Sequence, residues 1–596
     1  MTLFTLWAPR AERVELCLGR GEQAERREMR RAERHGWWEL AAPDQGPGAD
    51  YAFALDGGRP LPDPRSRHQP HGVHEASRVD DPAGFAWTDQ DWPGLALDDG
   101  VVYELHVGTF TPEGTFDAAI GRLDYLVALG VDFVEVMPVA AFPGQRGWGY
   151  DGVALWAVYE PYGGPEGLRR FVDACHARGI GVLLDVVYNH LGPSGNHLGE
   201  FGPYFTEKHH TPWGAAVNLD DAGSDEVRAF IVGNALHWFS AYHLDGLRLD
   251  AVHALADTRA IHVLEELSLA VDELAEELGR PLTLIAETDL NDPRIVTPRS
   301  HGGLGVHAQW DDDFHHALHT LLTGERQGYY ADFGSIAALA KTFEGAYFHD
   351  GGWSSFRGRS HGRPIDTELL SGGRFVVFLQ DHDQVGNRAL GDRVAAALSP
   401  GLLRVGAALL LTSPFVPMLF MGEEWGATTP WCYFTDHQEP ELGRAVREGR
   451  RREFAAHGWA AEAVPDPQDP DTFARSRLDW AEPLKEPGRA LFEWYRALIA
   501  LRRGTPELAS GSLREVGVEF DERARWIVLR RGAVRVVVNL AGAAQSVPVG
   551  AAVLDVLLAS EADVLVREQD AVLELPAESV AIVLCESPPV LEFEAV

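Results

Sequence analysis

Short apolar runs alternate with helical patterns from residue 101 onward. Eight runs are candidate strands: 101–105, 133–136, 182–186, 247–250, 282–287, 306–310, 375–379 and 417–420. Apolar runs separated by helices predict repeated βα units and a parallel sheet. Eight such units predict a multidomain α/β protein whose centre is a closed (β/α)8 TIM barrel.

One of the intervening helices can be tested by its period. Phe116, Ile120, Leu123 and Val127 recur at i, i+4, i+7 and i+11. This spacing predicts one apolar stripe facing the sheet.

The two ends of the chain have a different pattern. Up to about residue 92, short alternating segments are separated by Gly, Pro and Asp clusters, which predicts a small β-sandwich. Alternation returns after a helix near residues 491–503, which predicts a C-terminal antiparallel β domain. We therefore expect an N-terminal β-sandwich over 1–92, a catalytic barrel over 93–503 and a C-terminal β-sandwich over 504–596. The polar, aromatic segment 191–221 is too long for an ordinary βα connection and predicts a functional excursion at the barrel mouth.

The charge and composition of the chain limit the classes of partner that it can bind. The 596 residues carry a formal net charge of -37, which repels phosphate backbones and anionic lipid, so we expect no nucleic-acid and no membrane partner. The arginine-rich stretch 26–34 is interrupted by Glu28 and Glu33 and is typical of a solvated face. No apolar stretch approaches the roughly 20 residues that span a bilayer.

The location is expected to be cytoplasmic. The first residues, MTLFTLWAPRAERVEL, have neither a basic leader nor a small-residue cleavage site. The four cysteines lie far apart and form no C-x-x-C pair, which fits a reducing compartment better than a disulfide framework.

Acidic residues stand at the ends of several predicted strands, where barrel enzymes place their active sites. Asp185, Asp250, Glu287 and Asp383 occupy such positions. In GLRLD, the alternation of a strand puts Arg248 on the same side as Asp250. A single aspartate at a strand end is more often a helix cap or an ion-pair partner, but four in one barrel favour an active site.

Two of these carboxyl groups have complementary environments. Glu287 follows a wholly apolar run, and burial near other acids should raise its pKa, as a group that protonates a leaving oxygen requires. Retaining glycosidases need two carboxyl groups about 5 to 5.5 Å apart. The fourth and fifth strands are neighbours, so their ends could supply Asp250 and Glu287 as that pair.

Aromatic residues gather at the predicted barrel mouth, where their rings could stack on the C–H faces of sugars. Core packing is the alternative role for any one of them. The residues are Trp148, Tyr150, Tyr188, Tyr204, Phe205, Trp213, Trp425, Trp431, Tyr433 and Phe434.

Neither a metal nor a cofactor is expected. The pairs His209–His210 and His315–His316 lack the spacing of H-E-x-x-H, and no cysteine is near them. No glycine-rich nucleotide-binding motif follows a strand.

Four segments, DVVYNH, GLRLDAVH, LIAE and QDHDQVGN, resemble the four motif regions of the α-amylase family, in the same order. The resemblance covers roughly residues 101–503. It implies that Asp250 is the nucleophile, Glu287 the acid/base and Asp383 a third carboxylate that holds sugar hydroxyls. It also implies a sugar subsite at Tyr150, Asp151, Asp185, His190, Arg248 and His382.

Loop segments are similar to one particular member of that family: GWGYDGV, FGPYFTEKHHTPWG, DAVHALAD, AETDLNDPR, QWDDDFHHALH and PWCYFTDH. That member hydrolyses the α-1,4 bond next to a terminal trehalose. The likeness implies malto-oligosyltrehalose and other α-glucan oligosaccharides as substrates. Further substrate-binding residues are then expected at Trp213, His253, Asp313, Gln384 and Asn387.

Two alternatives remain. A glycogen branching enzyme would share the barrel, the three carboxylates and the N-terminal β-sandwich, although GYDGV differs from the GYQ-type sequence associated with branching enzymes. A non-catalytic glucan-binding protein would not need an intact set of three carboxylates.

Overall fold

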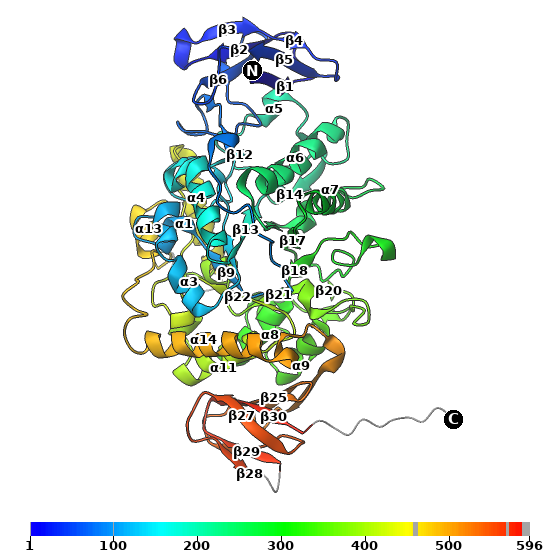
Figure 1. The fold of residues 1–596 in the computed structure, drawn as a ribbon, viewed down its shortest axis with the longest axis vertical. Coiled ribbons are helices and arrows are strands. Elements are labelled where there is room, and N and C mark those ends of the chain that lie inside the picture. The colour runs from blue at the N-terminus through cyan, green and yellow to red at the C-terminus, as the bar shows by residue number, and fades with distance from the viewer. Residues whose placement is uncertain (1, 99, 457–462, 568–570, 587–596) are drawn as a thin grey trace, which may run out of the picture.

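The computed structural model describes residues 2–98, 100–456, 463–567 and 571–586. At its centre, eight parallel strands close into a barrel (Figure 1). They are β9 (Val102–Leu105), β10 (Phe133–Val136), β13 (Gly181–Val186), β16 (Gly246–Leu249), β17 (Thr283–Ala286), β18 (Ala308–Trp310), β21 (Phe375–Phe378) and β22 (Val416–Phe420). The predicted barrel is confirmed, because each predicted run overlaps one of these strands.

The inside of the barrel changes from apolar to polar along the strands. Its lower part is a cluster that includes Val102, Phe133 and Leu183, all buried. Successive side chains of a strand alternate between faces, so the residue two positions further points the same way. These residues are Glu104, Glu135 and Asp185, and they bring buried acidic side chains to the carboxyl ends of the strands.

The helices that cover the barrel include α4 (Gly164–His176), α6 (Ser224–Tyr242), α7 (Val263–Leu278), α8 (Asp312–Thr323), α9 (Ile336–Gly345) and α11 (Pro400–Leu411). The helix tested by its period is broken into α2 (Phe116–Ile120) and α3 (Leu123–Leu129). In α3 the buried residues are Leu123, Leu126 and Leu129, at a spacing of three. Phe116 and Leu123 are fully buried, but Val127 is 45% exposed, so the prediction of one continuous stripe was wrong.

A β domain precedes the barrel, at the top of Figure 1. One sheet pairs β1 (Thr2–Trp7), β5 (Trp37–Ala42) and β4 (Arg30–Arg31). The other contains β3 (Glu25–Glu28), β2 (Val14–Leu18), β6 (Asp50–Leu55), β7 (Pro60–Leu61) and β8 (Ser77–Arg78). Phe4, Leu16 and Phe53 are buried in their shared core, as the predicted β-sandwich requires.

A second β domain follows α14 (Gly488–Gly504) and lies at the opposite end of the molecule (Figure 1). Its strands are antiparallel: β23 (Val516–Asp521), β24 (Trp526–Arg531), β25 (Val534–Asn539), β30 (Ser579–Cys585) and β27 (Val553–Ala559) in one sheet, and β26 (Gln545–Pro548), β29 (Val572–Leu575) and β28 (Leu565–Arg567) in the other. Helices α11 and α14 separate it from the barrel (Figure 1). The final residues of the predicted 504–596 domain, 587–596, lie outside the described part of the chain.

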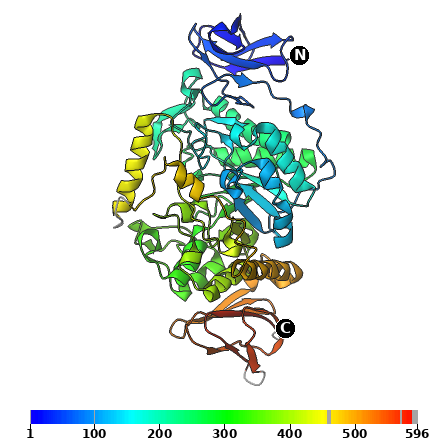
Figure 2. The ribbon, with the colours of Figure 1, turned by 90° about the vertical axis from the view of Figure 1, so that its left-hand side faces the viewer.

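Two long insertions carry structure of their own. The predicted excursion 191–221 holds α5 (Leu198–Phe201) and a hairpin of β14 (Phe205–Thr211) and β15 (Gly214–Val217). After β22 comes α12 (Pro440–Ala456), the yellow helix along the left side of Figure 2. Both contribute residues to the cavity described below.

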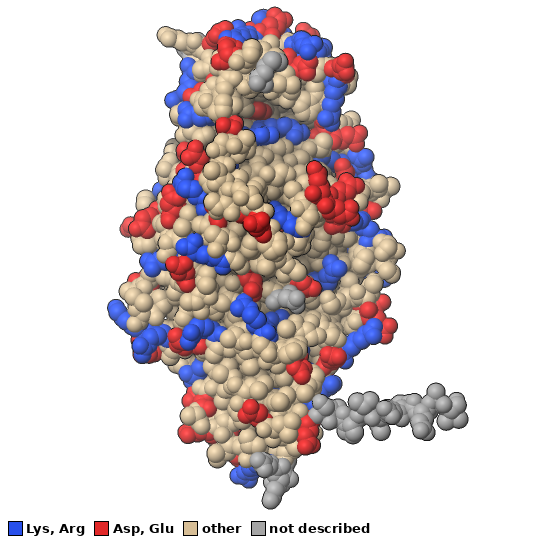
Figure 3. Space-filling model, viewed as in Figure 1, with Lys and Arg blue, Asp and Glu red and all other residues tan. Residues whose placement is uncertain are grey.

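The surface is mixed in charge. On the face shown in Figure 3, arginine and lysine side chains are interspersed with aspartate and glutamate. None of the described helices combines the length and the hydropathy needed to cross a bilayer.

Candidate active site

A cavity of about 880 Å³ lies at the carboxyl ends of the barrel strands. The excursion lines it with Phe205 and Trp213, and α12 lines it with Leu442, Val446 and Arg450. Nine of the predicted catalytic and substrate-binding residues line this cavity: Tyr150, Asp151, His190, Trp213, Asp250, His253, Glu287, Asp383 and Asn387.

Asp250 and Glu287 leave neighbouring strands at the same level. Leu249 in β16 is paired with Ala286 in β17, and each acid is the next residue of its chain segment. The guanidinium of Arg248 contacts both: its Nη1 lies 2.9 Å from Oδ1 of Asp250 and its Nη2 3.6 Å from Oε2 of Glu287. One buried cation therefore holds the two carboxyl groups together at the floor of the cavity.

Glu287 lies where its protonated form is favoured. Burial, together with the charges of Asp250 and Asp383, raises the pKa of Glu287 to about 7 against the opposing effect of Arg248. This is the direction predicted from the apolar run before it. Asp250 is fixed differently, since the side-chain amide of Asn189 donates to its Oδ2 at 2.9 Å.

A second layer lies beneath these acids. The hydroxyl of Tyr150 donates to Oδ2 of Asp185 at 2.5 Å and lies 2.7 Å from Nε2 of His382. Arg248 also contacts that Asp185 oxygen, at 2.8 Å, and Glu104 lies 2.5 Å from Nδ1 of His382. Asp185, Arg248 and His382 do not line the cavity themselves; they support Tyr150 and Asp250, which do.

His382 is the second cation of this layer. Burial alone would lower its pKa, but Glu104 and Asp383 outweigh burial and raise the pKa of His382 to about 10. Burial raises the pKa of Asp185 to about 6, with Arg248 opposing the change. At neutral pH this layer therefore contains an imidazolium and a guanidinium beneath the cavity.

Asp383 lies in the short helix α10 (His382–Gly386), whose first turn is capped by the Asp381 carboxylate accepting from the Gln384 amide. Asn387 follows the helix, and its side-chain amide donates to Oδ1 of Asp383 at 3.3 Å. The position of α10 thus decides where Asp383 meets a ligand.

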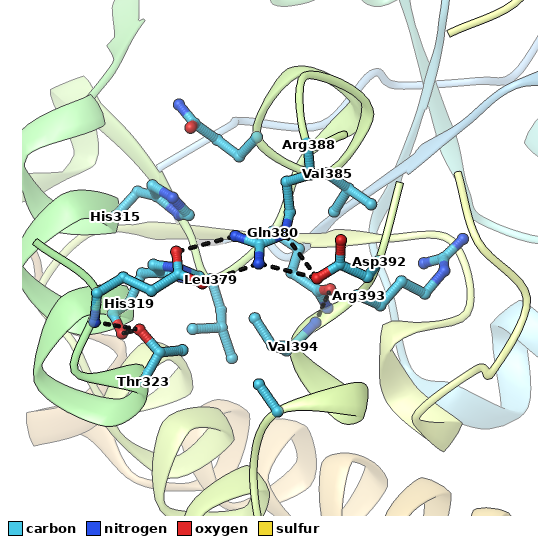
Figure 4. Close-up of a pocket in the computed structure, with 13 residues that line it drawn as sticks. His315, His319, Thr323, Leu379, Gln380, Val385, Arg388, Asp392, Arg393 and Val394 are labelled. Carbon is cyan, nitrogen blue, oxygen red and sulfur yellow. Dashed lines mark hydrogen bonds and ion pairs between the residues drawn. The ribbon is translucent and has the colours of Figure 1, made fainter. Parts of the chain in front are cut away.

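The chain segment that follows α10 is held in place by a network of charged side chains (Figure 4). Arg388 contacts Glu325 at 2.8 and 2.9 Å, and Glu325 lies 3.0 Å from His319 of α8. Arg388 also contacts Asp392 at 2.9 Å. This network attaches the segment that carries Asp383 to the outer helix layer.

His190 supports the other side of the cavity. Its Nε2 lies 3.1 Å from the carbonyl oxygen of Tyr150. Trp213 of the excursion stacks on the imidazole, with ring centroids 4.5 Å apart and an interplanar angle of 5°. Trp213 remains 50% exposed, so its other face is open to a ligand.

The structure places two predicted substrate-binding residues away from this cavity. Asp313 is buried in α8, where its Oδ2 accepts from the side chain of Asn291 at 2.8 Å and from the His349 amide at 2.7 Å. Gln384 faces the outer helix layer, with its Oε1 3.3 Å from the Tyr329 hydroxyl. Both residues lie within segments that carry the family resemblance, Gln384 in QDHDQVGN and Asp313 in QWDDDFHHALH, but their side chains point away from the cavity.

The aromatic cluster is smaller than predicted. Trp148, Tyr150, Phe205, Trp213 and Tyr433 line the cavity. The others are buried in protein packing: Tyr188, Tyr204, Trp425, Trp431 and Phe434. Core packing, the alternative role, thus accounts for half of the set.

The wall formed by α12 was not predicted. Leu442, Val446, Arg450 and Glu453 line the cavity from this helix. They stand at i, i+4, i+8 and i+11, so the helical period was the available signal. Arg450 also donates to the Gly386 carbonyl at 2.5 Å and thus connects α12 to α10.

Comparison with known proteins shows which family the chain belongs to. It is 58% identical over 547 residues to the malto-oligosyltrehalose trehalohydrolase of Arthrobacter ramosus, covering 91% of this chain and 94% of that one. It is 54% identical to the protein of the same name from Rhizobium sp. (strain M-11), covering 97% of each. The chain belongs to the malto-oligosyltrehalose trehalohydrolase family.

Family models and a solved structure agree with this placement. The model for the alpha amylase catalytic domain matches residues 81–207, that for carbohydrate-binding module 48 (isoamylase N-terminal domain) matches 1–71, and a domain of unknown function (DUF3459) matches 511–582. A crystal structure of an alpha-amylase-like protein from Salmonella typhimurium superposes with a TM-score of 0.88 at 38% identity, covering 98% of this chain and 97% of that one.

The malto-oligosyltrehalose trehalohydrolases are glycoside hydrolases of the α-amylase family, so the chain is an enzyme of that class. The catalytic domain and the carbohydrate-binding module together indicate α-glucan substrates. The comparisons do not indicate nucleic-acid binding.

Proposed function

We propose that this enzyme hydrolyses the α-1,4-glucosidic bond next to the terminal trehalose of malto-oligosyltrehalose, releasing trehalose and a malto-oligosaccharide. The observation that carries the reaction type is the contact of one guanidinium, that of Arg248, with both Asp250 and Glu287 at the cavity floor. This arrangement is compatible with the roughly 5 to 5.5 Å separation of a retaining pair. The specificity rests on the names of relatives that are 58% and 54% identical.

In the first step, the Asp250 carboxylate attacks the anomeric carbon of the glucose unit that precedes trehalose. The bond to the leaving oxygen breaks as Glu287 donates its proton to that oxygen, and trehalose departs. In the second step, Glu287 takes a proton from water, the water oxygen bonds to the anomeric carbon, and the bond to Asp250 breaks. The configuration at that carbon is retained.

The remaining cavity residues would bind and orient the sugar. We assign Asp383 to hydroxyl groups of the reacting glucose, because its carboxylate is 45% exposed in the cavity. Tyr150 and Trp213 offer aromatic faces to sugar rings. Asp151, His253 and Asn387 offer polar groups to the same cavity.

Product analysis tests the proposal. The enzyme is incubated with malto-oligosyltrehalose and, separately, with plain malto-oligosaccharide of the same length. Release of trehalose from the first, with little change in the second, is the expected result, and the new reducing end should form first as the α-anomer. Longer or branched glucans would identify a glucanotransferase, and an absence of products would identify a glucan-binding protein; either would overturn the proposal.

We also infer that the protein works in the cytoplasm. The cysteines, Cys17, Cys175, Cys432 and Cys585, are all buried and unpaired. A reducing compartment keeps thiols in that state.

A further inference from the structure

Glu135 of β10 has no assigned role, yet it lies in the charged layer beneath the cavity. Its side chain is 1% exposed, and neither carboxyl oxygen has a hydrogen-bond partner among the described residues. No ion pair within the described part of the chain involves it either. A buried polar group without a partner is costly, so a native protein retains one only where it is compensated.

The charged groups around Glu135 come from four elements. They are Glu104 of β9, Asp185 of β13, Arg248 of β16 and His382 of α10. Glu104 is paired with His382, and Arg248 is shared between Asp185 and the nucleophile candidate. Both nearby cations are therefore paired with other carboxylates, and Nε and Nη2 of Arg248 have no hydrogen-bond partner among the described residues. Burial beside Glu104 and Asp185 raises the pKa of Glu135 well above its usual range.

Asp185 has an acceptor oxygen that could take a hydrogen bond from Glu135. Its Oδ2 accepts from Tyr150 and Arg248, but its Oδ1 is buried without a hydrogen-bond partner among the described residues. In the parallel pairing of β10 with β13, Glu135 stands opposite Leu183, two residues before Asp185. A protonated carboxyl group can donate a hydrogen bond through its O–H. An ionised carboxylate can only accept one.

We propose that Glu135 is a positioning residue that stays a neutral carboxylic acid and donates a hydrogen bond, through one buried water molecule, to Oδ1 of Asp185. Buried waters typically occupy such sites, where polar atoms lack protein partners. The hydrogen bond favours the ionised form of Asp185. Asp185 then holds Arg248, and Arg248 holds Asp250 and Glu287 in place. The inference rests on the proposed function only for its activity readout.

Infrared difference spectroscopy tests the protonation state without turnover. Spectra of the wild type and of Glu135→Gln are compared at pH 7. Other buried acids contribute to both spectra, so the spectrum of the wild type minus that of Glu135→Gln should show one C=O stretching band of a protonated carboxyl group in an apolar site. Absence of that band from the difference spectrum would overturn the inference whatever the enzyme's substrate is.

Kinetics test the positioning role. Glu135→Gln retains a donor and should keep kcat within about threefold of the wild type, with an unchanged pH profile. Glu135→Leu removes the donor; we expect kcat to fall about tenfold or more with little change in KM. Its acidic limb of kcat/KM should move to higher pH, because the pKa of Asp185 rises when its donor is lost.

The pair of variants separates this role from simple packing. If the pH profile of Glu135→Gln shifts as far as that of Glu135→Leu, an ionised Glu135 is needed. That result would contradict the proposal. An unshifted profile in a folded Glu135→Leu would contradict it too. If Glu135→Leu does not fold, Glu135→Gln and the infrared band still decide. Exposed Glu113, changed to Gln, is the matched control.

Discussion

The backbone N–H of Ala251 donates a hydrogen bond to Oε2 of Glu287 across 2.6 Å. Ala251 directly follows Asp250 and has a left-handed backbone conformation with φ of 40°, which non-glycine residues adopt rarely and at a cost. The proposed acid/base is thus positioned by the residue next to the proposed nucleophile. Movement of either loop would displace both carboxyl groups together.

Asp250→Asn should abolish turnover and leave the fold intact. The amide cannot attack the anomeric carbon, so kcat should fall at least about a thousandfold. Steady-state assays on malto-oligosyltrehalose, with circular dichroism to confirm folding, measure this. Asp124→Asn, at a side chain that is 85% exposed, is the control. Wild-type turnover in folded Asp250→Asn would refute the assignment of the nucleophile.

Glu287→Gln should remove acid assistance to the leaving group. Its rate on malto-oligosyltrehalose should fall at least about a thousandfold, whereas a maltosyl fluoride, whose leaving group needs no proton, should lose far less in the first step. Burst kinetics with both substrates measure the difference. Equal losses on the two substrates would point to another residue as the acid.

The raised pKa of Glu287 also predicts a pH-dependent effect on stability. The folded protein keeps a proton up to a pKa of about 7, whereas the unfolded chain releases it near 4.5. The unfolded state therefore binds fewer protons between these values, and the free energy of unfolding falls as pH rises through that window.

Glu287→Gln removes that titration. The variant should be more stable than the wild type at pH 8 by about 3 kcal/mol, and the difference should disappear near pH 4. Urea unfolding at both pH values measures it. A stability difference that is the same at the two values would show that Glu287 does not hold its proton in the folded protein.

Tyr150→Phe should separate hydrogen bonding from stacking. The ring remains, but Asp185 and His382 lose the hydroxyl that lies between them. We expect kcat to fall roughly tenfold to a hundredfold, with a smaller change in KM. Tyr188→Phe is the matched control, because its buried hydroxyl donates to Asn234 at 2.7 Å outside the cavity. Equal losses in the two variants would indicate a general packing effect.

The sequence predicted the barrel because its strands are continuous apolar runs, and the acids at their ends follow from that register. It could not predict side-chain direction on the connecting segments. Asp313 lies three residues beyond β18, yet the turn of α8 directs it toward Asn291 and away from the cavity. Trp431 is similarly directed into the core, where its indole donates to the His382 carbonyl at 2.9 Å.

The sharing of Arg248 has a consequence for how this site can change. One guanidinium serves Asp185, Asp250 and Glu287, so the effect of replacing any of these acids depends on the other two. Contacting residues of this kind give non-additive double mutants. Lysine offers a single ammonium in place of the planar fork and could not reproduce the three contacts. Substitutions at these four positions should therefore be epistatic, and the group should vary across a lineage only as a unit.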